Sequence, residues 1–148
     1  MLKFVLIGAG LVILTVLLHA IGTAAWLKHL ALRHGENDSP WSTWLSMRIL
    51  SASVLVLITL HTIQIAIWAV AYLSLGEVSE LVSFEAALYF SFVTFTTLGY
   101  GDITLSEPWR VMSGIQALNG ILLVGWTTAF LFALLQRSWK SMLQNSGS

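Results

Sequence analysis

The chain has 148 residues, of which 57% are hydrophobic and 9% are charged, with seven basic and seven acidic side chains. Soluble domains carry roughly 25% charged residues, so this chain lacks the polar side chains that would cover a soluble protein of its size. The mean hydropathy of +0.82 agrees. These values exclude a cytosolic enzyme, a DNA-binding module and a disordered linker as first interpretations, and they predict membrane lipid as the surroundings. The balanced charge predicts no nucleic-acid partner, and without cysteine there is no disulfide framework or thiolate metal site.

The first apolar stretch runs from Phe4 to Leu27. A membrane-spanning helix needs about 20 apolar residues, so we expect an N-terminal spanning helix within residues 1–32. A signal peptide with Lys3 as its charged start is the alternative, but the apolar stretch is longer than such a segment needs. The polar side chains within the stretch are Thr15, His19 and Thr23.

Residues 33–48 are more polar, and we expect them to form a cytoplasmic loop. Ser39-Pro40 is typical of a helix start, because serine caps a helix and proline suits its first position. Four residues then follow at the spacing of one helical face, and two of them are tryptophans, which favour the headgroup level of a membrane. This pattern fits a short interfacial helix or the first turns of the next span equally well. The four residues are Trp41, Trp44, Leu45 and Arg48.

The remaining chain divides into a second span over 49–75, a short helix over about 83–96, a polar loop over 97–102, a third span over 107–137 and a short tail over 138–148. The uncharged part of the short helix has only about ten residues, which suits a re-entrant segment better than a span. The fold class expected from this pattern is an all-α membrane protein with three transmembrane helices and one re-entrant helix and loop.

The informative motif is Thr96-Thr97-Leu98-Gly99-Tyr100-Gly101-Asp102, between the short helix and the third span. Non-helical backbone at membrane depth is tolerated only where it is buried in protein or lines a wet path. Two glycines spaced one residue apart let a strand twist so that successive carbonyl groups point the same way. The motif resembles the filter of the potassium-channel pore-domain family, T-V-G-Y-G often followed by Asp, and the resemblance covers about residues 49–135 as outer helix, pore helix, filter and inner helix.

The resemblance implies a potassium channel that conducts K⁺ passively as a homotetramer, because four copies of the loop close each ion site. It needs no cofactor, since K⁺ is the permeant species, and it leaves any regulatory partner unknown. Thr97, Leu98, Gly99 and Tyr100 would bind K⁺, and Gly101 completes the filter. The residues expected to support the filter are Thr96, Asp102 and Tyr89.

Leu98 stands where the commonest pattern has valine, and its larger side chain would pack behind the filter. Many family members brace the filter aspartate through a glutamate or tryptophan of the pore helix. Here the matching positions are Val93 and Phe90, which cannot hydrogen-bond a carboxylate, so Tyr89 is the candidate donor to Asp102.

The third span carries Gly120, close to the position of the family's hinge glycine, although close helix packing is the alternative role. One helical face that continues from Gly120 would line a cavity, and an apolar ring of Phe132 at its far end could gate by shedding water; Phe132 facing lipid is the alternative. The cavity residues expected on this face are Ile121, Val124 and Thr128.

The basic residues predict an orientation. With the filter mouth outside, five of the seven basic residues lie on the cytoplasmic side, in agreement with the positive-inside rule. We therefore expect a multi-pass protein of the plasma or inner membrane, with its N-terminus outside and its C-terminus cytoplasmic. For His19 and His61, near mid-span, we favour hydrogen bonds between helices over a pH sensor.

The alternatives to a potassium channel are a weakly selective monovalent cation channel and a non-conducting accessory membrane subunit. An enzyme is the least favoured interpretation, because no acid–base or nucleophile constellation is present.

Overall fold

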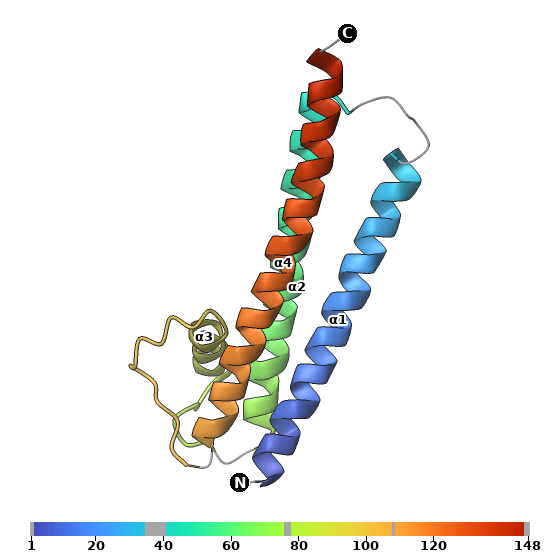
Figure 1. Ribbon diagram of the computed structural model, residues 1–148. Helices are drawn as coiled ribbons and strands as arrows, with labels where there is room; N and C mark the ends of the chain where they lie inside the picture. Colours follow the sequence, from blue (N-terminus) through green and yellow to red (C-terminus); the bar gives the residue numbers. More distant parts are fainter. Residues whose placement is uncertain (1, 35–40, 76–77, 108, 147–148) are drawn as a thin grey trace.

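The computed structural model describes residues 2–34, 41–75, 78–107 and 109–146. Over these residues, helices are the only regular secondary structure. The described residues form three long helices and one short helix. Figure 1 shows the long helices side by side and the short helix beside them near one end. The long helices are α1 (Leu2–His34), α2 (Thr43–Ser74) and α4 (Trp109–Ser146), and the short helix is α3 (Phe84–Phe95). The fold class predicted from the sequence is confirmed.

The three long helices are each long and apolar enough to cross a membrane. The chain runs along α1, returns along α2 and runs back along α4, so the end of α1, the start of α2 and the end of α4 gather at one end of the bundle (Figure 1). All three helices contact one another, whereas α3 contacts α2 and α4 only. At 1.5 Å per residue, the 12 residues of α3 span about 18 Å, which is too short to cross the roughly 30 Å hydrocarbon core.

Local capping sets the start of α3. The Ser83 side chain accepts a hydrogen bond from the Ala86 amide at 3.1 Å, and Glu85 lies in the first turn, where a negative charge favours the helix dipole. The helix ends with Thr96 as its C-cap. The observed α3 therefore lies within the 83–96 segment predicted from the sequence.

The bounds of α2 and α4 differ from those expected. The second span begins at Thr43 with Ser42 as its N-cap and continues unbroken through Arg48. Trp44, Leu45 and Arg48 therefore belong to the first turns of α2, whereas Trp41 precedes its N-cap. The helix start expected at Ser39-Pro40 lies outside the described residues. At the other end, α4 continues to Ser146, so most of the expected tail is helical.

Buried apolar side chains form separate clusters at the two ends of the bundle. The cluster beside α3 joins α2, α3 and α4 and includes Trp68, Tyr72, Phe90, Trp109 and Met112. The cluster at the opposite end joins α1, α2 and α4 and includes Leu30, Trp41, Ile49 and Leu134. The short helix and the loop that follows it are thus held from one side by a well-packed core.

Candidate functional site

The loop Thr96–Asp102 leaves α3 directly and is anchored to its last turn. The Thr97 amide donates to the Thr94 carbonyl at 3.0 Å, and the Leu98 amide donates to the Val93 carbonyl at 2.9 Å. These bonds fix where the loop starts relative to α3. Val93, which the sequence singled out only as a position that cannot brace Asp102, serves the loop through its backbone, and no side-chain pattern could reveal that role.

The loop backbone alternates in handedness. The φ angles of Thr97, Gly99 and Gly101 are positive, at 58°, 56° and 80°, and none of the intervening residues has a positive φ. A positive φ is uncommon for a β-branched residue such as threonine, and glycine adopts it at little cost. Reversal of handedness at every second residue keeps neighbouring peptide groups similarly oriented, as the glycine spacing predicts, so this geometry suits a row of carbonyl oxygens on one side of the strand.

The side of the loop that faces away from α3 is open in a single chain. Every residue from Thr96 to Asp102 is exposed, and the large apolar side chains Leu98 and Tyr100 are 56% and 67% exposed. A Cβ placed on Gly99 or Gly101 would meet nothing within 4 Å. One chain therefore holds this loop from its α3 end and leaves the rest of its surface uncovered.

Asp102 is held by Tyr89, whose hydroxyl donates to the Asp102 Oδ2 atom at 2.7 Å. The prediction that Tyr89 donates a hydrogen bond to Asp102 is confirmed. The hydrogen bond stabilises the charged carboxylate and lowers the pKa of Asp102 below its usual value. It also links the far end of the loop back to α3.

A second carboxylate joins the two linkers that flank α3 and the loop. The Ser106 amide donates to the Glu80 Oε1 atom at 3.1 Å, and the Ser79 hydroxyl donates to the other carboxylate oxygen at 3.1 Å. A hydrogen bond from the Ser106 side chain is the main cause that lowers the pKa of Glu80, and the bond from the Ser106 amide acts in the same direction. Glu80 thus has hydrogen-bond partners on both sides of α3 and the loop.

A cavity of about 450 Å³ lies between the loop, α3 and the start of α4. Val93, Gly99, Gly101 and Arg110 are among the residues that line it. The Arg110 Nε atom donates to the Leu105 carbonyl at 3.3 Å. The space behind the loop is therefore not filled by the chain itself.

Contacts with α4 position α3 from behind. Gly120 is buried, and a Cβ there would run into the carbonyl oxygen of Phe95 at the end of α3. The Gln116 side chain donates to the Ser91 carbonyl at 3.3 Å and accepts a hydrogen bond from the Tyr72 hydroxyl at 3.0 Å. The close approach of α3 and α4 at this point explains why a glycine stands at position 120. The role of Gly120 as a hinge stays a prediction.

The three residues expected to line a cavity and the expected gate residue Phe132 all lie on the uncovered side of α4. Ile121, Val124 and Phe132 are 57%, 46% and 58% exposed, and Thr128 is exposed with its hydroxyl bonded to the Val124 carbonyl of its own helix. In a single chain these four side chains are therefore exposed. Their place around a shared pore stays a prediction.

A buried polar network joins the three long helices at mid-span. The His61 Nε2 atom lies 2.8 Å from the Thr127 hydroxyl, and the Gln64 Nε2 atom lies 3.2 Å from the His19 Nδ1 atom. The two imidazole rings stack with centroids 5.2 Å apart. The prediction that these histidines hydrogen-bond between helices is confirmed. Thr127 was missed, since a threonine that usually bonds its own helix gives no sign of a partner 66 residues away.

The chain is similar to known ion channel proteins. A family model for an ion channel matches residues 56–137, more than half of the chain. The voltage-gated potassium channel regulatory subunit KCNG1 of Homo sapiens, Mus musculus and Rattus norvegicus is 31% identical over 71 residues, which are 47% of this chain and 14% of each relative. The chain thus spans a small part of these relatives, and no solved structure matches it.

The matched segment contains α3, most of α2 and α4, and the whole loop from Thr96 to Asp102, whereas His19 of the mid-span network lies outside it. Membership in such a family implies transport rather than catalysis. The chain belongs to the ion channel family, in the group that shares the potassium-channel pore domain.

Proposed function

We propose that the chain forms a potassium-selective channel in which four copies surround one pore. The observation that carries the proposal is the alternating backbone of the loop, with positive φ at Thr97, Gly99 and Gly101. In this geometry the carbonyl groups of Thr97, Leu98, Gly99 and Tyr100 form a row of oxygen ligands. Potassium-channel filters use such rings of carbonyls to replace the hydration shell of the ion. K⁺ is then the permeant species.

The exposure of the loop supports the need for further copies. Backbone polar groups at membrane depth have to be buried in protein or line a water-filled path, and in one chain residues 96–102 are exposed. Four loops around an axis would give each one a water-filled side and a side covered by protein.

The α3 helix ends at the loop, so the negative end of its dipole favours a cation there. Tyr89 and Asp102 would keep the loop in register with α3.

For the orientation we propose that the N-terminus lies outside and that the end of α4 lies in the cytoplasm of a plasma or inner membrane. The basic residues gather on the end of α1, the start of α2 and the end of α4, which share one end of the bundle (Figure 1). The positive-inside rule assigns that end to the cytoplasm. These residues are Lys28, Arg33, Arg48, Arg137 and Lys140.

For the cavity below the filter we propose the exposed face of α4, with Ile121, Val124 and Thr128 as lining residues. Phe132 lies 12 positions beyond Gly120, about 18 Å along the helix, and its ring is 58% exposed. Four such rings would form a hydrophobic constriction that gates by loss of water.

A second candidate function is a non-conducting accessory subunit. One observation favours it: the curated relatives are named regulatory subunits of voltage-gated potassium channels. A weakly selective cation channel is the other alternative, since Leu98 departs from the commonest filter sequence. The purified chain alone separates these possibilities, because an accessory subunit carries no flux without its partner.

The test is K⁺ flux from liposomes that contain only the purified chain. We expect the wild-type protein to conduct and Gly101→Ala to lose the flux, because alanine resists the φ of 80° at this position. Gly125→Ala is the matched control, since a Cβ there meets nothing within 4 Å. Native mass spectrometry of both variants should show tetramers. No flux from the wild type favours the accessory subunit, and full flux in Gly101→Ala shows that the loop is not the filter.

A further inference from the structure

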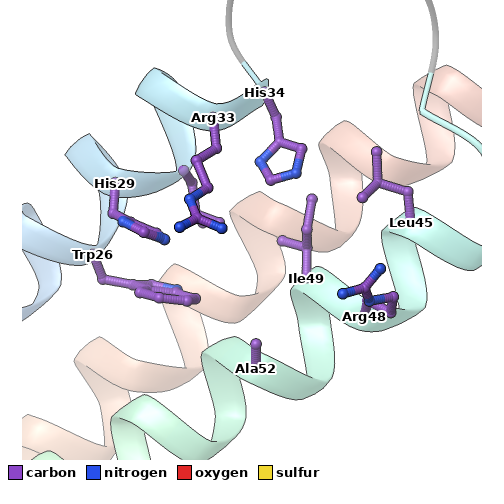
Figure 2. Close-up of a pocket in the computed structure, with 9 residues that line it drawn as sticks. Trp26, His29, Arg33, His34, Leu45, Arg48, Ile49 and Ala52 are labelled. Atoms are coloured by element: carbon purple, nitrogen blue, oxygen red, sulfur yellow. The ribbon is translucent and has the colours of Figure 1, made fainter.

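A second cavity, of about 200 Å³, lies between α1 and α2 at the end of the bundle opposite the filter loop. Figure 2 shows Arg33 and His34 reaching from the last turn of α1 toward α2, with Arg48 on the facing helix. His29 and Trp26 form another side of the cavity, with their rings stacked at 5.3 Å. The space is smaller than the roughly 300–1,000 Å³ of drug-sized ligand pockets, so it suits a compact group.

The charge of this cavity is of one sign. Two arginines and two histidines line it, and none of its lining residues is acidic. Among the residues that the structure describes, no carboxylate forms a salt bridge with either arginine, and Arg48 instead lies 4.5 Å from the ring centroid of Trp44. The buried Nδ1 atom of His34 has no hydrogen-bond partner in the described part of the chain. Two guanidinium groups around one cavity, with no carboxylate bonded to them among the described residues, are suited to an anion.

The depth of the cavity points to a lipid. The 33 residues of α1 extend about 50 Å, well beyond the roughly 30 Å hydrocarbon core, so its basic last turns lie at headgroup level. Exposed apolar side chains continue along both helices from the cavity toward the membrane interior, with Ile21 of α1 and Leu55 of α2 at 67% and 66% exposure. Trp26 and Trp44 flank the cavity, and tryptophan favours the same interfacial level.

We propose that this cavity binds the phosphate of an anionic phospholipid headgroup. Arg33 and Arg48 hold the phosphate oxygens from opposite helices, and His34 donates a further hydrogen bond. The acyl chains lie along the exposed apolar side chains of α1 and α2. The bound lipid thereby joins the N-terminal helix to the first turns of α2. This proposal requires only that the helices span a membrane, and it stands independently of K⁺ selectivity.

The test is a titration of the purified full-length chain in detergent with phosphatidylglycerol or phosphatidylcholine, with bound lipid counted by native mass spectrometry. We expect phosphatidylglycerol to bind at least about tenfold more tightly, because only its headgroup carries net negative charge. The double variant Arg33→Gln/Arg48→Gln should lose this preference. Lys28→Gln is the matched control, since Lys28 is on the same helix and outside the cavity. Equal loss in Lys28→Gln would mean general surface attraction and would overturn the proposal.

A steric variant tests the cavity without any change of charge. Ala52 lines the cavity and Ser51 is exposed outside it, so Ala52→Phe should displace the lipid while Ser51→Phe should retain it. Unchanged binding in Ala52→Phe would contradict the assignment. Displacement of phosphatidylglycerol by millimolar inorganic phosphate would assign the site to a free anion and refute the lipid. All variants should elute as the wild-type oligomer, which separates lost binding from lost folding.

Discussion

Polar groups in the mid-span network are hydrogen-bonded within the chain, whereas polar groups in the filter loop are exposed. Where α1, α2 and α4 meet, each ring nitrogen of His19 and His61 has a partner within 3.5 Å in the same chain. In the loop 96–102 every residue is exposed, and the backbone is bound to the chain mainly at its α3 end. The first region is complete within one chain, and the second depends on neighbours.

This difference separates the determinants of stability from those of function. Polar groups in lipid find partners wherever the fold allows, because an unpaired one costs several kcal/mol. The network lets α1 pack on the pore helices with its polar side chains satisfied. The loop keeps its polar groups available, which suits a shared axis. Changes in the network should therefore alter stability with little effect on selectivity, and changes in the loop should do the reverse.

The largest effect on stability is expected for Gly120→Ala. The added Cβ would run into the Phe95 carbonyl, and forced displacement of packed helices costs about 1–3 kcal/mol. Thermal unfolding of the detergent-purified channel should show a lower Tm, while Gly114→Ala, where a Cβ meets nothing within 4 Å, should leave it unchanged. An unchanged Tm together with altered single-channel gating would favour the hinge over close packing.

A smaller effect is expected for His61→Leu, which removes the contacts with Thr127 and Gln64. Interhelical hydrogen bonds in membranes contribute about 1 kcal/mol each, so the Tm should fall modestly while K⁺ over Na⁺ selectivity is retained. Thr62→Val is the matched control, because Thr62 bonds only the Ile58 carbonyl of its own helix. Loss of selectivity in His61→Leu would show that the two regions are not separable.

The smallest effect is expected for Tyr89→Phe, which removes the hydrogen bond to Asp102. Since that bond lowers the pKa of Asp102, its stabilising contribution is complete above the unfolded value of about 3.9 and is lost as the pH falls through the lower folded pKa. In Tyr89→Phe the pKa of Asp102 should move up toward its ordinary value. A carboxyl NMR titration of both proteins measures this shift, and identical midpoints would exclude the bond.

The sequence predicted the features that depend on local pattern. The three spans follow from runs of apolar residues, and α3 follows from an uncharged stretch that is too short to span a membrane. The sequence indicates Tyr89 as the donor to Asp102, 13 positions away, because the family resemblance places the brace of this aspartate in the pore helix and Val93 and Phe90 cannot supply it.

Features that depend on how helices face one another were not predictable. The partner of His61, the contact between Gly120 and Phe95, and the cavity that joins Arg33 to Arg48 all require the rotation and depth of each helix. The continuous start of α2 was left open, since tryptophans at helical spacing fit both alternatives. The end of α4 lies beyond residue 137, where the apolar pattern ends, because a helix continues readily past the membrane surface.

The central claim is that the loop from Thr97 to Gly101 selects K⁺ in an assembly of this chain alone. The most direct measurement is the reversal potential of the purified chain in a planar bilayer with opposed K⁺ and Na⁺ gradients. We predict a reversal close to the K⁺ equilibrium potential. A reversal near zero would show a weakly selective pore, and the absence of any current from the tetramer would show a subunit that does not conduct; either result would contradict the account.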